Sequence, residues 1–209
     1  GCFDRRARCK DWTGPPLSGW ARALTVLEDY VVQVACEAAV LVKDGAVVKT
    51  LDAGPTTNEE EEEWRRHDIC ALGSSSTYLA AGLVDGSLRR WSTEDWAIEV
   101  LPNALLHRAV GVSVEEDGAV VACDAASVKR FWAADALEWT APAKIAAFAS
   151  FEATVAVGLT NGEVWLLDAA SLTPLRSVAA SEVGVASVAL SRDVLVVGDA
   201  EGVVVAFDL

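Results

Sequence analysis

The chain has 209 residues, 52% of them hydrophobic, and its 31 acidic and 17 basic side chains give a formal net charge of −14. No apolar run approaches the ~18 uninterrupted residues of a transmembrane helix, so no membrane span is predicted. The negative charge argues against direct binding to nucleic acid, which needs clustered Lys and Arg, and it favours protein partners, basic ones in particular.

Short strands are predicted from the N-terminal region onward, because apolar residues there alternate with polar ones or form continuous runs. A helix would instead place apolar residues at every third or fourth position. Before the one segment that breaks this pattern, the predicted strands cover residues 5–12, 20–27, 31–36, 39–42 and 46–51.

An acidic insertion interrupts the pattern at residues 52–67. Like charges in a row repel each other and resist burial, so we expect an exposed loop. Two interpretations stay open. The segment is a solvated insertion without function, or it is an acidic segment that attracts a basic partner, with a Trp side chain as the anchor of the contact. On the second interpretation the candidate partner-binding residues are Glu59, Glu60, Glu61, Glu62, Glu63 and Trp64.

A stretch that recurs along the chain dominates the rest of the sequence. Residues 78–91, YLAAGLVDGSLRRW, predict two strands joined by a tight turn, because Gly86 after Asp85 supplies the positive φ that a hairpin needs. Similar stretches follow at residues 119–132, 154–168 and 194–209. The equivalent turn positions give a period near 40 residues: 45, 86, 126, 162 and 202.

Four short strands are predicted within each of these periods after the insertion, except that the last period has three. A period of about 40 residues with four strands is typical of a β-propeller blade. We therefore predict an all-β protein, a single β-propeller domain over residues 1–209, with about five blades' worth of four-stranded antiparallel sheet. The predicted strands are residues 68–72, 77–82, 87–91 and 96–100; 109–114, 119–122, 127–132 and 137–140; 144–150, 154–158, 163–168 and 174–178; and 185–190, 194–198 and 203–209.

The repeats resemble those of the WD40 family, which close on a small-small-Gly step, an Asp-Gly turn, a Val- or Leu-rich strand and Trp-Asp. No Gly-His dipeptide opens any repeat, so the buried His–Asp network of that family is mostly missing here. The closing pairs are Trp91-Ser92, Phe131-Trp132, Leu167-Asp168 and Phe207-Asp208. The resemblance assigns a role in turns and blade packing to Gly82, Asp85, Gly86, Trp91, Gly158, Gly162, Asp168, Gly198, Gly202 and Asp208.

The number of blades is fewer than the seven with which family members most often close their ring. A ring that stays open leaves strand edges that invite aggregation. We expect the chain, which begins at Gly1 and contains no methionine, to be part of a larger, seven-bladed propeller. In the alternative, residues 5–12 lie outside the ring and residues 20–27 complete the last blade.

Catalytic and metal-binding patterns are not found in the sequence. The two histidines, His67 and His107, stand apart from any nucleophile, and no glycine-rich phosphate loop precedes a helix. The cysteines form no CxxC pair, and their usage is typical of a reduced, intracellular protein, cytoplasmic or nuclear. They are Cys2, Cys9, Cys36, Cys70 and Cys123. We predict no catalytic residues, no cofactor and no metal.

The resemblance then implies a non-enzymatic scaffold for protein–protein interactions in an intracellular multiprotein complex. A first alternative is substrate recognition for a ubiquitin ligase, a role the family often has. Adaptor docking in that group uses an Arg two residues after the closing pair, where this chain has Glu94 and Ala170. A hydrolase built on the propeller is a weaker alternative.

Overall fold

The computed structural model describes residues 8–9, 12–13, 21–35, 38–44, 46–52, 69–101, 105–132 and 135–209. Within these ranges every assigned element is a β-strand, and no helix is long and apolar enough to cross a membrane. The chain divides into two compact units, which are described one at a time. The first comprises Gly1–Arg108 and Val114–Gly118, and the second Ala109–Ser113 and Ala119–Leu209.

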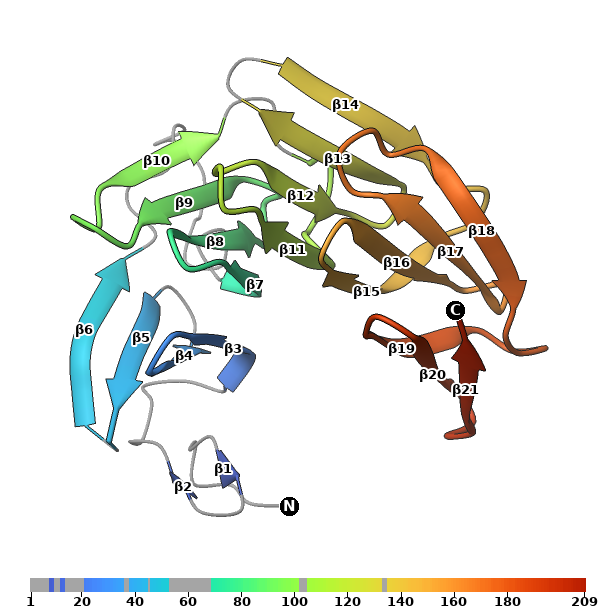
Figure 1. The fold of residues 1–209 in the computed structure, drawn as a ribbon, viewed down its shortest axis with the longest axis horizontal. Coiled ribbons are helices and arrows are strands. Elements are labelled where there is room, and N and C mark those ends of the chain that lie inside the picture. Colours follow the sequence, from blue (N-terminus) through green and yellow to red (C-terminus); the bar gives the residue numbers. More distant parts are fainter. Residues whose placement is uncertain are drawn as a thin grey trace. The chain divides into compact units, whose positions relative to one another are not determined.

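The first unit contains two four-stranded antiparallel sheets in which strands follow each other in chain order (Figure 1). One sheet consists of β3 (Ala21–Leu27), β4 (Tyr30–Ala35), β5 (Ala38–Lys43) and β6 (Ala46–Asp52). The other consists of β7 (Ile69–Ser74), β8 (Tyr78–Leu83), β9 (Leu88–Ser92) and β10 (Ile98–Leu101). A small hairpin of β1 (Arg8–Cys9) and β2 (Trp12–Thr13) precedes them.

The second unit contains the remaining sheets, and the last of them has three strands (Figure 1). Its first sheet consists of β11 (Gly111–Val114), β12 (Val120–Cys123), β13 (Ser127–Trp132) and β14 (Asp135–Thr140). The last residue of β11 is assigned to the first unit. The next is β15 (Ile145–Phe151), β16 (Thr154–Leu159), β17 (Glu163–Asp168) and β18 (Pro174–Ala179). The last is β19 (Val185–Leu190), β20 (Val194–Asp199) and β21 (Val204–Asp208).

Within each unit the sheets pack face to face through apolar side chains on their inner strands. In the first unit β7 lies against β3, and one cluster joins Val32 and Val34 of β4 to Leu79 and Ala81 of β8. In the second unit β19 lies against β15 and β16. The prediction of an all-β propeller built from four-stranded antiparallel blades is confirmed.

One prediction near the N-terminus is wrong, and one alternative is contradicted. The predicted single strand over residues 5–12 is replaced by two short antiparallel strands with Cys9 opposite Trp12, and partners only three positions apart require the chain to reverse. The alternative in which residues 20–27 complete the last blade is contradicted for the described part of that segment. Residues 21–27 form β3, which pairs with β4 across the two-residue turn Glu28-Asp29, and a connection this short requires antiparallel neighbours.

Candidate functional site

Hairpin turns between the second and third strands of four sheets share one hydrogen-bond arrangement. In each, a side-chain oxygen accepts backbone N–H groups two to four residues later, an Asx-type turn. Asp85 accepts from Ser87 (2.8 Å), Asp124 from Ala126 and Ser127 (2.7 and 3.0 Å), Asn161 from Glu163 (3.2 Å), and Asp199 from Glu201 and Val203 (both 2.9 Å). These carboxylates and this amide therefore fix the backbone of the turns.

Asp199 was missed by the repeat spacing, which put Glu201 in the turn position. Its carboxylate also accepts a hydrogen bond from Ser181 Oγ at 2.9 Å. The backbone N–H of Val203, then the Ser181 hydroxyl and further backbone N–H groups, lower the pKa of Asp199. The signal available in the sequence was a replacement at the strand end. Asp199 follows Gly198, whereas leucine follows the equivalent glycines in Gly82-Leu83 and Gly158-Leu159.

The residues assigned to the repeat lie in strands and turns. Gly86, Gly162 and Gly202 have φ of 83°, 87° and 87° in hairpin turns. Gly82, Gly158 and Gly198 lie in β8, β16 and β20, opposite Leu88, Val164 and Val204. Trp91 is buried in the core of the first unit, and Asp208 ends β21.

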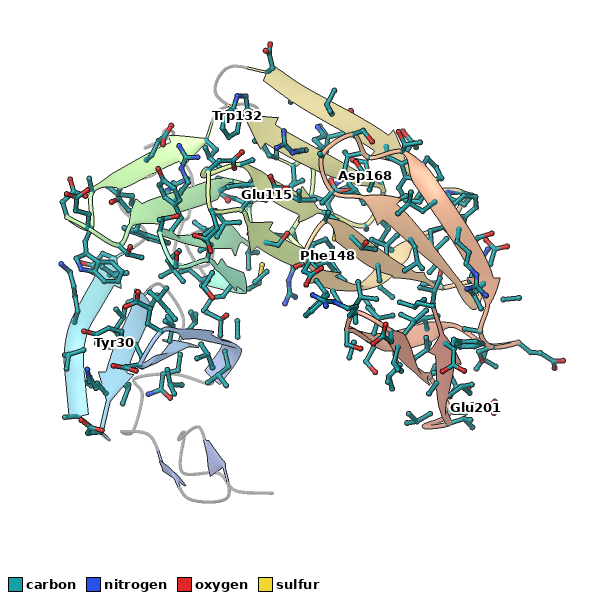
Figure 2. The ribbon with its side chains drawn as sticks, viewed as in Figure 1. Tyr30, Glu115, Trp132, Phe148, Asp168 and Glu201 are labelled. Carbon is teal, nitrogen blue, oxygen red and sulfur yellow. The ribbon has the colours of Figure 1, made fainter. Side chains whose placement is uncertain are left out.

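Asp168 ends β17 and caps the next turn (Figure 2). Its carboxylate accepts hydrogen bonds from the backbone N–H (2.8 Å) and the hydroxyl (2.7 Å) of Ser171. These bonds lower the pKa of Asp168. The acidic member of this closing pair therefore stabilises a turn.

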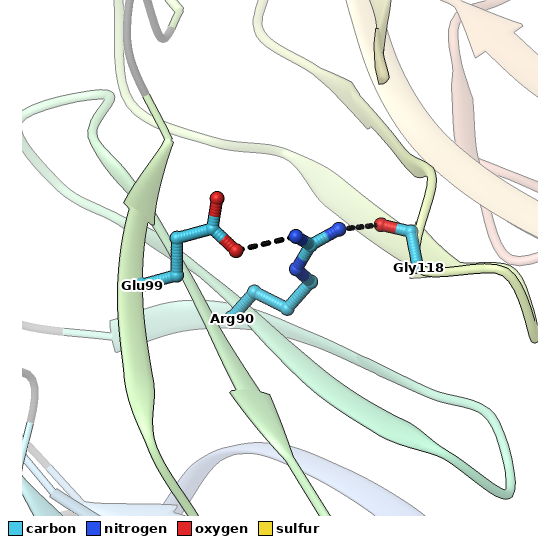
Figure 3. Close-up of polar contacts among 3 residues, drawn as sticks. All are labelled: Arg90, Glu99 and Gly118. Carbon is cyan, nitrogen blue, oxygen red and sulfur yellow. Dashed lines mark hydrogen bonds and ion pairs between the residues drawn. The ribbon is translucent and has the colours of Figure 1, made fainter. Parts of the chain in front are cut away.

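Arg90 of β9 joins its own sheet to the loop that follows β11 (Figure 3). Its guanidinium forms an ion pair with Glu99 of β10, directly opposite, and donates to the Gly118 carbonyl oxygen. The same group lies over the Tyr78 ring, 5.0 Å from the centroid. In the second unit Lys129 and Glu138 are also directly opposite each other, with Lys129 Nζ 3.9 Å from Glu138 Oε1. In both sheets a basic side chain of the third strand is therefore paired with a carboxylate of the fourth strand.

Glu116 in the same loop is held by the turn between β7 and β8. Its carboxylate accepts from the backbone N–H (3.1 Å) and hydroxyl (2.5 Å) of Ser76. The Thr77 hydroxyl donates to the Glu116 carbonyl oxygen at 2.8 Å, and the Ser75 hydroxyl donates to that of Glu115 at 3.3 Å. The Ser76 bonds in particular lower the pKa of Glu116. This loop is therefore held to the preceding blade by several bonds.

Carboxylates gather at one edge of the first unit, at the turns that join first to second and third to fourth strands. In an antiparallel meander these turns lie at the same edge of the sheet. The two sheets share this edge, because Ser74 at the end of β7 bonds to Thr25 (2.9 Å) and to the Val26 carbonyl oxygen (2.8 Å) near the end of β3. We name it the acidic turn edge: Glu28, Asp29, Asp44, Glu94, Asp95, Glu116 and Asp117, all exposed.

One cation at the acidic turn edge is neutralised locally. Lys43 Nζ lies 3.3 Å from Asp29 Oδ2, and this carboxylate raises the pKa of Lys43. The predicted partner-binding residues Glu59, Glu60, Glu61, Glu62, Glu63 and Trp64 lie outside the described residues, as does His67. The acidic turn edge was not singled out from the sequence, because its carboxylates come from turns far apart along the chain.

No group of three or more His, Cys, Asp or Glu side chains placed to hold a metal occurs in the described part of the chain. His107 is exposed in the connection after β10. Cys123 is a free thiol, completely buried on β12, and burial raises its pKa. A thiol with a raised pKa is a poor nucleophile, so Cys123 packs as a small apolar group.

No family model matches the chain, and neither does any curated protein. Among solved structures it is similar to the computationally designed Ika8 protein, with a TM-score of 0.70 and 16% identity, over 94% of this chain and 61% of that chain. The computationally designed Ika4 protein has a TM-score of 0.59 and 18% identity, over 68% and 91%. The β-propeller domain of Cps50 (Swd1) from Myceliophteria thermophila has a TM-score of 0.71 and 13% identity, over 92% and 67%. The fold is that of a β-propeller.

Proposed function

We propose that the chain is a WD40-like β-propeller that acts as a non-enzymatic scaffold for protein–protein interactions in an intracellular complex. The observation that carries this proposal is the use of the turn side chains. Asp85, Asp124, Asp168, Asp199 and Glu116 are all engaged in holding turns and loops. A propeller whose polar groups stiffen its turns is suited to presenting a fixed surface to partners.

The acidic turn edge is where we place a basic partner. Its carboxylates project from short turns between rigid strands, so a partner meets them without much loss of conformational freedom. With a net charge of −14, the chain attracts cationic segments over about one Debye length, roughly 8 Å at physiological salt. The glutamates of residues 59–63 would add to the same attraction.

Affinity purification of the tagged chain from its source cell, with charge-reversed variants, tests this function. Glu28→Lys with Glu94→Lys reverses two charges of the acidic turn edge. Glu182→Lys with Glu201→Lys is the matched control, the same change at exposed turns of the second unit. We expect stable partners to copurify with the wild type and the control, and to be lost from the first variant. Equal recovery on all three, or hydrolytic turnover by the purified chain, would refute the proposal.

A further inference from the structure

The hairpin turn between β16 and β17 contains the one asparagine of the chain that is followed by glycine, Asn161 before Gly162. Asparagine is a thermolabile residue, because the backbone nitrogen that follows it can attack its side-chain amide carbon. A side chain on the next residue hinders this attack, and glycine has none. A glycine backbone also reaches the required conformations more readily than other residues do. The side chain of Asn161 is exposed, so this pair combines reactivity with access to water.

The reaction is an intramolecular substitution whose only other reactant is water. The Gly162 nitrogen gives up its proton and forms a bond to Cγ of Asn161. The bond from Cγ to Nδ2 breaks, and ammonia leaves with that proton. Water then opens the resulting succinimide ring at one of its two carbonyl carbons. Opening at Cγ gives aspartate, whereas opening at the backbone carbonyl carbon gives isoaspartate, in which the chain runs through Cγ.

In the folded turn each reacting group is held by a hydrogen bond. The Gly162 N–H donates to the Leu159 carbonyl oxygen at 3.1 Å. The Asn161 amide is held at both ends by Glu163, since Oδ1 accepts from the backbone N–H and Nδ2 donates to the carboxylate, both at 3.2 Å. The attack requires the Gly162 nitrogen to lose its proton and to turn toward Cγ. These hydrogen bonds therefore have to break before the reaction starts.

The connection after β18 closes over the same glycine. The backbone N–H groups of Ala180 and Ser181 donate to the Gly162 carbonyl oxygen at 3.0 and 3.1 Å. A Cβ on Gly162 would overlap with the carbonyl oxygens of Ser181 and Val183. The Ser181 hydroxyl fixes the connection, since it donates to Asp199 Oδ2 (2.9 Å) and accepts from the Val183 N–H (3.1 Å). The Gly162 peptide is thus free to rotate only when the connection moves away.

We propose that Asn161 is a deamidation site whose reactivity is controlled by the connection at residues 180–183. The reaction takes place in a locally opened form, in which Gly162 is released from the connection and from Leu159. Its rate in the folded chain is the rate in the open turn multiplied by the fraction of molecules in which the turn is open. Modification at Asn161 therefore records how often this part of the second unit opens.

The two products fit the turn differently. Aspartate matches the equivalent turn of the first unit, where Asp85 precedes Gly86 and its carboxylate accepts from the Ser87 backbone N–H at 2.8 Å. Isoaspartate instead adds a methylene group to the backbone, which displaces Gly162 from Leu159 and from the connection. The aspartate product keeps the hairpin closed, whereas the isoaspartate product holds it open.

The test is the rate of deamidation at each asparagine of the whole chain, incubated at mildly alkaline pH and analysed by peptide mass spectrometry. Each event replaces an NH2 group by OH, which changes the mass, and fragmentation distinguishes isoaspartate from aspartate. In urea Asn161 should react faster than Asn58 and Asn103, which precede Glu59 and Ala104. In the folded chain Asn161 should react at least about tenfold more slowly than in urea, because the turn is mostly closed.

A serine pair tests control by the connection. Ser181→Ala removes both side-chain bonds of the connection and leaves residues 159–163 unchanged, so folded Asn161 should react about three- to tenfold faster. Ser181→Thr keeps the hydroxyl and should react like the wild type. Ser191→Ala is the matched control, because Ser191 accepts from the Val194 N–H (3.2 Å) in the turn between β19 and β20, and it should leave the rate unchanged.

Circular dichroism before incubation shows which variants are folded, and in urea all of them should react at the wild-type rate. Three results would overturn the proposal: a folded wild type that reacts as fast as in urea, an Asn161 that is no faster than the other asparagines in urea, or equal rates for folded Ser181→Ala and Ser191→Ala. If Ser181→Ala does not fold, the comparison of the folded wild type with the chain in urea still decides.

Discussion

The turns at Gly162 and Gly202 have the same backbone and different surroundings. Both glycines have φ of 87°, and both turns are held by an Asx-type hydrogen bond, which the side-chain oxygen of Asn161 accepts in one turn and that of Asp199 in the other. A Cβ on Gly162 would overlap with the carbonyl oxygen of Ser181, in the connection to the next sheet, whereas one on Gly202 would meet nothing. Local sequence thus determines the turn, and the following blade determines how tightly the turn is packed.

Substituting these two glycines by alanine should give the largest difference. Gly202→Ala suffers only the unfavourable φ, and we expect a loss of about 1–2 kcal/mol in the free energy of unfolding. Gly162→Ala adds an overlap with backbone atoms that cannot move away cheaply, for a total of about 3–5 kcal/mol. Urea unfolding followed by circular dichroism measures both. Equal losses would mean that the connection after β18 does not pack against this turn.

A valine pair makes the same comparison on the sheet face. Val164→Ala removes buried methyl groups from the core of the second unit and should cost about 2 kcal/mol. Val204→Ala, at the equivalent exposed position, should change stability by less than about 0.5 kcal/mol. A large cost at Val204 would show that this side chain is covered in solution.

The strands of the repeat could be predicted because their signals are local. β13, β17 and β19 coincide with the predicted residues 127–132, 163–168 and 185–190, where apolar runs end at turn residues on both sides. The roles of Glu116 and Asp199 could not. The role of Glu116 depends on Ser76, which is 40 positions away in the chain. The role of Asp199 depends on which of two carboxylates, Asp199 or Glu201, caps the turn, and only the backbone geometry decides this.

A buried glutamine shows another limit of the repeat pattern. Gln33 is 0% exposed, and neither Oε1 nor Nε2 has a hydrogen-bond partner among the residues that the structure describes. The register places it where the other sheets have Ala81, Val157 and Val197. Alternation along β4 predicts the face on which this residue lies, but it does not say whether its amide finds a partner there.

Gln33→Leu should therefore stabilise the chain, because it removes an unsatisfied amide and keeps the side-chain volume. We expect a gain of about 1–2 kcal/mol in the free energy of unfolding. Gln33→Ala is the control, since it removes the amide and leaves a cavity, and it should stabilise less or not at all. Thermal and urea unfolding of the three proteins give the order. A loss of stability in Gln33→Leu would show that the amide is hydrogen-bonded in solution.

The smallest expected effect concerns pH and the Asp199 turn. Hydrogen bonds from Val203, Ser181 and Glu201 lower the pKa of Asp199 in the folded state, below the value of about 3.9 usual for an unfolded chain. A lowered folded pKa stabilises the fold above the unfolded pKa, and this contribution is lost as the pH falls through the folded pKa. In Asp199→Asn the amide oxygen still accepts hydrogen bonds, but the charge and its titration are gone.

The stability difference between wild type and Asp199→Asn should therefore be full at pH 6 to 7 and shrink below about pH 4. Urea unfolding at a series of pH values measures it. Glu201→Gln removes one negative charge from the same turn without touching the carboxylate that caps it, so it separates capping from net charge. In the Asn161 turn the side chain that accepts the hydrogen bond is an amide, so that turn already lacks this titration. A difference that stays constant across the series would mean that Asp199 does not hold its turn through its charge.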